Sequence, residues 1–286
     1  MTSSPEPGQA QQATPDLFPE LTPAPPRQRP EDRDRSEWDP RSAPGTYFLL
    51  ALNIAVFLWM VTHGVSYTSP SPEQLLHFGA NSTVLVVVDG EWYRLLTATF
   101  VHIGIIHIAT NMWCLWNLGL LGEPLLGPFG LVAVYVLTGV AGNMLSIAWD
   151  IGLALLRHVP LEITVGAGAS GAVFGIAGIL IVLLSNRRLP IPWEELRRLR
   201  TSVVRFAAIN LLIGGSTILG AAFFSGFMRI DNSAHIGGFV CGLALGPPLV
   251  PRMTAGRTKY LNRQKLTFGG AAFVLSLFGY WIANLK

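Results

Sequence analysis

Two short polar segments stand out in an otherwise apolar sequence, because each holds a residue type that can do nucleophilic or acid–base chemistry. The segment GAGASG at 166–171 contains Ser170, and SAHIGGFVCG at 233–242 contains His235. A serine hydroxyl attacks a carbonyl carbon only when a base takes its proton, and imidazole is the base suited to neutral pH. Ser170 and His235 are therefore a candidate nucleophile–base pair. No carboxylate within the apolar segments is placed to complete a triad, so we expect a dyad.

A third segment, HIGIIHIATN at 102–111, offers hydrogen-bond donors. His107 and Asn111 are four residues apart and share one face of a helix. Together with the backbone N–H of Ser170, they could hold an oxyanion. His102 points elsewhere on the same helix, which suggests a structural role.

Taken singly, each segment also has a structural explanation. Ser170 could be a helix N-cap, and His235 could be a histidine bonded to a backbone carbonyl. His107 and Asn111 could form a polar clasp between helices. Their positions relative to one another decide between these explanations and a shared site.

The elements that must position these residues are membrane-spanning helices. Half of the 286 residues are hydrophobic, mean hydropathy is +0.44, and only 13% of residues are charged. A soluble domain devotes about 25% of its residues to charge. Because the apolar residues form long blocks, we predict an all-α polytopic membrane protein. Seven blocks can each span a bilayer: 47–65, 98–121, 129–149, 170–185, 206–224, 233–250 and 266–285.

The same composition argues against other classes of protein. The net charge is +3 and the pI about 9.1, but the basic residues lie between apolar blocks, as topology signals do. We therefore expect no nucleic-acid partner. Cys114 and Cys241 both fall in apolar blocks and indicate no disulfide framework. No basic-then-apolar signal peptide is visible at the N-terminus.

Charges in the loops predict the orientation of the helices. The 186–205 loop holds six arginines, and the 251–265 loop holds five basic residues and no acid. By contrast, 150–169 and 225–232 hold one arginine each, Arg157 and Arg229. The excess predicts that the two basic loops and the N-terminus are cytoplasmic and that the C-terminus is outside. The second, fourth and sixth spans then run inward from the outer face.

This orientation places the polar segments in one layer. Ser170, His235 and the pair His107–Asn111 lie in the first turns of those three spans, roughly 15 Å or less below the outer surface. Unrelated structural polar groups would not be expected to share one depth. Small residues on the fourth and sixth spans also allow close helix packing. They are Gly171, Gly175 and Gly178 on one helix and Gly238, Gly242 and Gly246 on the other.

The pattern resembles the rhomboid family of intramembrane serine proteases, over about residues 47–250. The matching motifs are GASG (168–171), AHIGG (234–238), HIGIIHIATN (102–111), EWYR (91–94, with Tyr93 in place of Trp) and the pair Leu118-Gly119 with Gly122-Glu123-Pro124.

The resemblance implies a role for each matching residue. Ser170 would attack the scissile carbonyl and His235 would be the general base. His107, Asn111 and the Ser170 N–H would hold the oxyanion.

Four further residues are assigned supporting roles by the resemblance. Gly168 belongs to the serine motif, and Arg94 to a structural loop between the first two spans. Glu123 would have a structural role where the second span ends. Phe174 stands where the family has an aromatic stacked on the catalytic histidine, and here it lacks a hydroxyl.

Composition, loop charges and the resemblance together predict the organisation of the chain. We expect a disordered cytoplasmic tail at 1–46, a six-helix catalytic membrane domain at 47–250, and a basic cytoplasmic loop with one additional C-terminal transmembrane helix at 251–286. The site would open to the extracytoplasmic side, and we expect a bacterial plasma membrane.

The expected reaction is hydrolysis of peptide bonds in or near transmembrane segments, with membrane-protein substrates in the lipid bilayer, no cofactor and no metal. Two rival functions are less favoured: a non-proteolytic relative that binds or escorts membrane proteins, and a transporter or channel. The first usually lacks the serine or the histidine, and the second usually has acidic relays or internal repeats.

Overall fold

The structure is a computed structural model that describes residues 41–161, 163–220, 231–251 and 256–285, with only the backbone for 214–220. The described part of the chain is helical and forms no strand, apart from an isolated antiparallel bridge between Asn81 and Gly166. This confirms the all-α class. The helices are α1 (Pro44–Thr62), α2 (Pro72–His77), α3 (Thr83–Val87), α4 (Arg94–Thr97), α5 (Ile105–Arg157), α6 (Ser170–Leu183), α7 (Trp193–Gly220), α8 (Asn232–Leu249) and α9 (Arg257–Ala283).

Helix α5 holds two of the predicted spans and reverses direction between them. Its 53 residues include Gly127, whose φ of 72° lies in the left-handed region, followed by Pro128. A straight helix would separate residues 107 and 143 by about 54 Å. Both His107 and Asn143 nevertheless line one cavity. The chain therefore folds back at Gly127, and we call 105–126 the first arm and 128–157 the second arm.

The start of α5 corrects one expectation. The second span was predicted to be helical from residue 98, with His102 inside it, but the helix begins at Ile105. Gly104 has a φ of 96°, and a Cβ on it would lie 2.9 Å from the carbonyl oxygen of Thr68. Only glycine fits this turn, so the preceding residues, His102 included, form a loop.

The number of spans stays a prediction. Within the described residues, α1, α5 and α9 are long and apolar enough to cross a membrane, and α6 is a shorter apolar helix. The predicted span at 206–224 lies mainly on α7 and that at 233–250 on α8, although 221–224 fall outside the described residues. The predicted tail falls outside the described residues up to residue 40, and α1 begins at Pro44 rather than at 47.

Helix α6 packs against α8 through the predicted glycine ridges. A Cβ on Gly238 would lie 1.9 Å from the carbonyl oxygen of Gly171, and a Cβ on Gly242 would lie 2.0 Å from that of Gly175. Real Cβ atoms do not approach a backbone oxygen this closely. The two helices can therefore touch only because these positions lack side chains.

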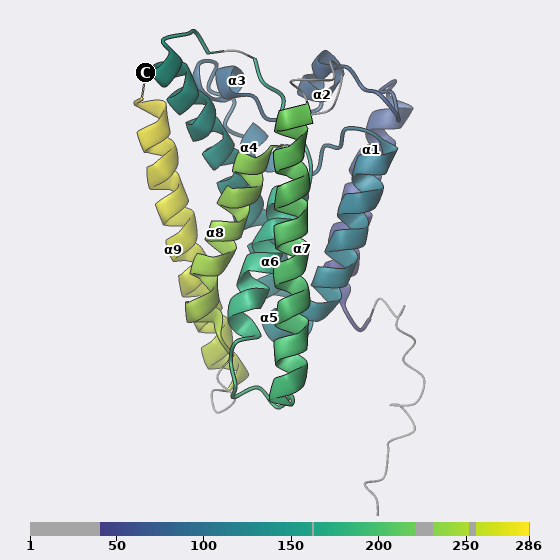
Figure 1. The fold of residues 1–286 in the computed structure, drawn as a ribbon, viewed down its shortest axis with the longest axis vertical. Coiled ribbons are helices and arrows are strands. Elements are labelled where there is room, and N and C mark those ends of the chain that lie inside the picture. The colour runs from purple at the N-terminus through teal and green to yellow at the C-terminus, as the bar shows by residue number, and fades with distance from the viewer. Residues whose placement is uncertain (1–40, 162, 221–230, 252–255, 286) are drawn as a thin grey trace, which may run out of the picture. The chain divides into compact units, whose positions relative to one another are not determined.

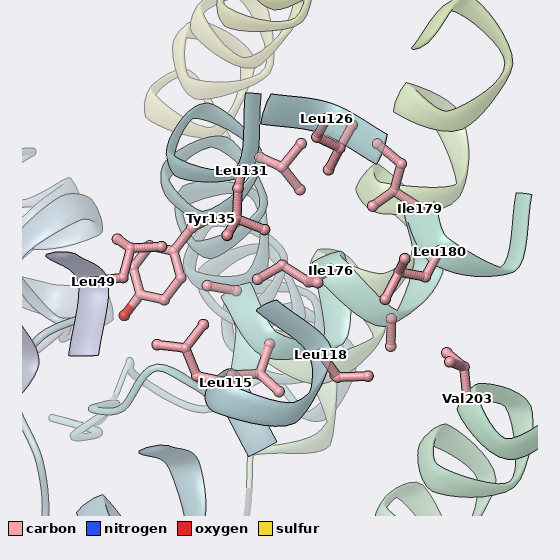
Figure 2. Packing of buried hydrophobic residues seen from close by; sticks show 14 of the residues in the cluster. Leu49, Leu115, Leu118, Leu126, Leu131, Tyr135, Ile176, Ile179, Leu180 and Val203 are labelled. Atoms are coloured by element: carbon pink, nitrogen blue, oxygen red, sulfur yellow. The ribbon is translucent and has the colours of Figure 1, made fainter. Parts of the chain in front are cut away.

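The apolar core surrounds α6 (Figure 2). Tyr135 of the second arm is fully buried, and its hydroxyl oxygen lies 3.0 Å from the Thr99 carbonyl oxygen and 3.1 Å from Asn53 Oδ1, either of which can accept its one hydrogen. The core joins side chains from α1, both arms of α5, α6 and α7: Leu49, Leu115, Leu118, Leu126, Leu131, Ile176, Ile179, Leu180 and Val203.

Successive helix ends alternate between the two ends of the bundle. In Figure 1, α1 begins at the end of the bundle where α6 finishes, α7 begins, and α8 is followed by α9. The two basic loops thus share an end with the start of α1. The first turns of α5, α6 and α8 lie at the opposite end (Figure 1), where the predicted site residues are.

A single methyl group tests the close approach of α6 and α8. Gly238→Ala places a Cβ against the Gly171 carbonyl, so overpacking should cost about 1–3 kcal/mol and lower the thermal unfolding midpoint in detergent micelles. The control is Gly269→Ala on α9, where a Cβ meets nothing within 4 Å. Equal midpoints for the two variants would show that the helices are not in contact there.

Candidate active site

A cavity of about 190 Å³ brings together the predicted catalytic and oxyanion residues. It lies where the first turns of α5, α6 and α8 meet, beside the segment 165–168. Of the predicted residues, Ser170, His235, His107, Asn111, Phe174 and Gly168 line it, and Arg94 and Glu123 do not.

Ser170 is the first residue of α6. The N-cap is Ala169, and no side-chain capping hydrogen bond is present there. The structural explanation of Ser170 as an N-cap is therefore wrong. Its backbone N–H belongs to the first helical turn, where N–H groups have no intrahelical acceptor and can bind an anion.

The loop before Ser170 is held by backbone contacts from distant segments. Gly168 N donates to the Ala98 carbonyl at 2.9 Å, and Ala169 N donates to His102 Nε2 at 3.5 Å. His102 is fully buried, and its Nδ1 lies 3.1 Å from the Phe100 carbonyl. His102 thus holds Ala169, the residue before Ser170. This contact gives a concrete form to the structural role expected for His102.

His107 is oriented as a donor. Its Nδ1 accepts from Ile103 N at 3.3 Å, so the ring proton is on Nε2. The ring packs over Gly168, whose φ is 131° and whose Cβ would lie only 2.6 Å from His107 Cε1. Asn111 donates one amide hydrogen to the His107 carbonyl at 2.9 Å, which leaves its second amide hydrogen for another acceptor.

His235 is buried, with 6% of its surface exposed, and lies one turn into α8. Phe174 stacks on it with ring centroids 4.4 Å apart and an interplanar angle of 17°. Its Nδ1 has no hydrogen-bond partner. In the described part of the chain no hydrogen bond joins His235 to Ser170, so the dyad stays a prediction. Catalytic hydrogen bonds often tighten only when substrate is bound.

Asp231 is a cavity residue that sequence reasoning missed. It is the N-cap of α8, where it accepts from Ala234 N at 3.0 Å and from the Ser233 hydroxyl at 2.5 Å. It also accepts from the Ser146 hydroxyl of the second arm at 2.5 Å. The sequence signal was an Asp just before an apolar run, which is typical of a helix start. Asp231 lies two residues before the predicted span at 233–250. It is therefore not a carboxylate within the apolar segments, where a triad member was expected.

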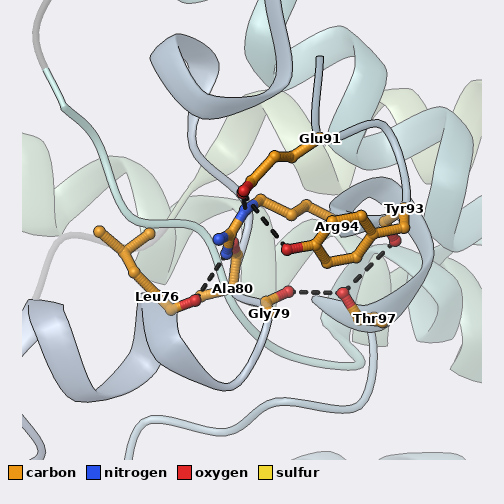
Figure 3. Close-up of polar contacts among 7 residues, drawn as sticks. All are labelled: Leu76, Gly79, Ala80, Glu91, Tyr93, Arg94 and Thr97. Atoms are coloured by element: carbon orange, nitrogen blue, oxygen red, sulfur yellow. Dashed lines mark hydrogen bonds and ion pairs between the residues drawn. The ribbon is translucent and has the colours of Figure 1, made fainter. Parts of the chain in front are cut away.

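Arg94 closes the loop between α1 and α5 (Figure 3). Its guanidinium pairs with Glu91 and donates to the carbonyls of Leu76 at 2.6 Å and Ala80 at 3.0 Å. The Thr97 hydroxyl donates to the Gly79 carbonyl at 2.7 Å beside it. These contacts tie α2 to α4 and lie away from the cavity.

Glu123 holds the start of α1. Its carboxylate accepts from Gly45 N at 2.8 Å and from both the backbone N and the hydroxyl of Thr46 at 2.7 Å. A carboxylate at a helix N-terminus satisfies free N–H groups and the positive end of the helix dipole. Glu123 therefore joins α1 to the first arm of α5.

Comparison with known proteins identifies the family. The family described as Rhomboid domain matches residues 89–252, more than half of the chain. The chain belongs to the rhomboid family. It is 35% identical over 208 residues to rhomboid protease GluP of Bacillus subtilis (strain 168), covering 71% of this chain and 35% of GluP.

Two further rhomboid relatives have similar identities. Rhomboid protease AarA of Providencia stuartii is 31% identical over 216 residues, covering 72% of this chain and 73% of AarA. Rhomboid-like protease 2 of Toxoplasma gondii is 30% identical over 199 residues, covering 68% of this chain and 62% of that protein. The chain thus spans about a third of GluP and nearly three quarters of AarA. It carries a rhomboid domain, and its long apolar helices are those of an integral membrane protein.

The contact between Gly168 and His107 gives a test of the site. Gly168→Ala strains a left-handed residue and pushes the His107 ring, so labelling of Ser170 by a fluorophosphonate should fall by about 10²-fold or more. The control is Gly152→Ala on the second arm, where a Cβ meets nothing within 4 Å. Labelling equal to that of the control would contradict the role of this contact.

Proposed function

We propose that this chain is an intramembrane serine endopeptidase that hydrolyses peptide bonds in or near transmembrane segments by means of a Ser170–His235 dyad. The observation that carries the proposal is the cavity itself. In a chain of the rhomboid family, it collects Ser170, His235, His107 and Asn111 from three helices.

Each group has a chemical task in this reaction. His235 takes the Ser170 proton as the hydroxyl oxygen bonds to the scissile carbonyl carbon, and it then gives that proton to the leaving amine. The carbonyl oxygen becomes an oxyanion that accepts from the Ser170 N–H, His107 Nε2–H and the second amide hydrogen of Asn111. Water, deprotonated by His235, then attacks the acyl carbon, and His235 returns the proton to the Ser170 oxygen as the acyl group leaves.

Phe174 and Asp231 support the base in this scheme. Stacking on Phe174 restricts the imidazole to one plane, and the Asp231 cap fixes the start of α8 one turn before His235. Because Phe174 has no hydroxyl, it orients the ring by packing alone.

The bilayer imposes a preference on the substrate. A peptide bond in a transmembrane helix is protected by its own hydrogen bonds, so the substrate must unwind locally to reach Ser170. Gly and Pro weaken helices by about 1 and 3 kcal/mol, and their presence near the cleaved bond lowers the cost of unwinding.

The loop charges support an orientation for this enzyme. We propose seven spans with a cytoplasmic N-terminal tail at 1–46, a catalytic domain at 47–250 and a basic loop plus seventh helix at 251–286. The site then opens to the extracytoplasmic side of a bacterial plasma membrane.

Removal of either member of the dyad tests the reaction. Ser170→Ala and His235→Ala should each lower cleavage of a transmembrane substrate by at least about 10³-fold, because nucleophile and base act as a unit. Ser276→Ala, at an exposed serine of α9, is the matched control. Persistent cleavage by Ser170→Ala would contradict the dyad. If a fluorophosphonate does not label Ser170 in the unaltered protein, a non-proteolytic relative is favoured instead.

A pair of substrates tests the need for unwinding. The purified protein should cleave a Gly-containing transmembrane segment in lipid bilayers and leave a leucine-only segment of equal length largely intact. Product is measured by mass spectrometry, which also locates the cut. Equal cleavage of both segments would contradict the unwinding requirement.

A further inference from the structure

Two arginines lie against one tryptophan where α6 ends and α7 begins. The guanidinium carbon of Arg187 lies 4.4 Å from the centroid of the Trp193 ring, and that of Arg200 lies 5.7 Å from it. Trp193 is half-buried and packs against the apolar core, so the indole fixes where the two cations gather.

No carboxylate neutralises these two guanidinium groups. In the part of the chain that the structure describes, the ion pair of this segment joins Arg198 to Glu195 at 3.8 Å, and Arg187 and Arg200 form none. Arg200 donates instead to the Ser185 hydroxyl at 3.2 Å. Across 186–205 there are six arginines against two glutamates. Two like charges on one ring repel each other, and an anion bound to both would remove that repulsion.

The headgroup layer of the bilayer lies at this level. The contact between Arg200 and Ser185 sets Arg200 beside the end of α6. Arg205 lies about 7.5 Å further along α7 and is exposed, as are the apolar side chains of Val204 and Ile209. A cation on a lipid-facing surface is stable where its side chain reaches the headgroups. Tryptophan is enriched at the same interface.

Beyond this level the outward surface of α7 is apolar. Ile209 is 55% exposed and Leu212 is 73% exposed. In a chain that spans a membrane, such side chains contact the acyl chains of lipids. A ligand with a phosphate group and acyl chains therefore meets cations and apolar surface in the order in which it presents its own groups.

We propose that Arg187, Arg200 and Trp193 form a binding site for the phosphate of an anionic phospholipid. The phosphate oxygens accept from both guanidinium groups, whose planar forks match phosphate geometry. The negative headgroup complements the excess of arginine, and the acyl chains lie along α7. Phe206 and Asn210 of this helix line the candidate active-site cavity, so the bound lipid anchors one wall of that cavity.

Native mass spectrometry of the full-length protein, released from detergent micelles, measures the lipid that stays bound. With equal amounts of phosphatidylglycerol and phosphatidylcholine, the unaltered protein should retain the anionic lipid in at least about fivefold excess. Arg187→Gln combined with Arg200→Gln should weaken phosphatidylglycerol binding by about tenfold or more, because each arginine near an anionic headgroup contributes about fivefold.

Two further variants distinguish this site from a diffuse basic surface. Lys259→Gln combined with Lys265→Gln removes equal charge from exposed positions of α9 at the same end of the bundle (Figure 1), and should change binding by less than about twofold. Arg187→Lys combined with Arg200→Lys keeps the charge but loses the planar forks, and should weaken binding by about threefold or more.

Equal losses in the two glutamine pairs, or no loss in the lysine pair, would overturn the site in favour of general surface charge. So would a lack of preference for phosphatidylglycerol in the unaltered protein. Release of the bound lipid by millimolar inorganic phosphate would assign the arginines to a soluble anion instead of a lipid.

Discussion

The close contact of α6 and α8 is the constraint on which the site depends. In lipid there is no hydrophobic force between apolar helices, so association relies on packing and on polar contacts. Gly171 and Gly175 present their carbonyls where Gly238 and Gly242 lack side chains, and the helix backbones meet directly. Ser170 is one residue before the first of these contacts, and His235 is three residues before its partner. The ridge therefore sets the spacing between the proposed nucleophile and the proposed base.

Polar side chains at the opposite end of the bundle serve a different purpose, because a bilayer offers no water to unpaired backbone groups. Glu123 accepts hydrogen bonds from the free N–H groups at the start of α1. Gln264 of α9 donates to the Leu126 carbonyl at 2.7 Å, just before the reversal at Gly127. Arg263 donates to the Val250 carbonyl at 2.6 Å, where α8 has ended. These contacts lock α1, α5, α8 and α9 together.

Asp231 ties the elements of the site together at the end of the bundle where the site lies. It caps the helix that carries His235, holds the second arm through Ser146, and contributes to the wall of the candidate site's cavity. A single carboxylate thereby couples the placement of His235 to the second arm of α5. Arg94 and Glu123 act at a distance, by fixing loops and helix ends rather than by lining the cavity.

The sequence by itself determined the class of protein and predicted that the site residues share one depth. Long apolar blocks, loop charges and glycines at helical spacing placed Ser170, His235, His107 and Asn111 at one end of three helices, because each signal is local and follows the helical repeat. Only the tertiary structure decided how the loops hold those residues. The left-handed turn at Gly104 took His102 out of the helix and set it against Ala169, 67 residues away. Asp231 joins α8 to the second arm of α5 because it accepts a hydrogen bond from Ser146, 85 residues away. Loop geometry follows from such distant contacts, which no local periodicity records.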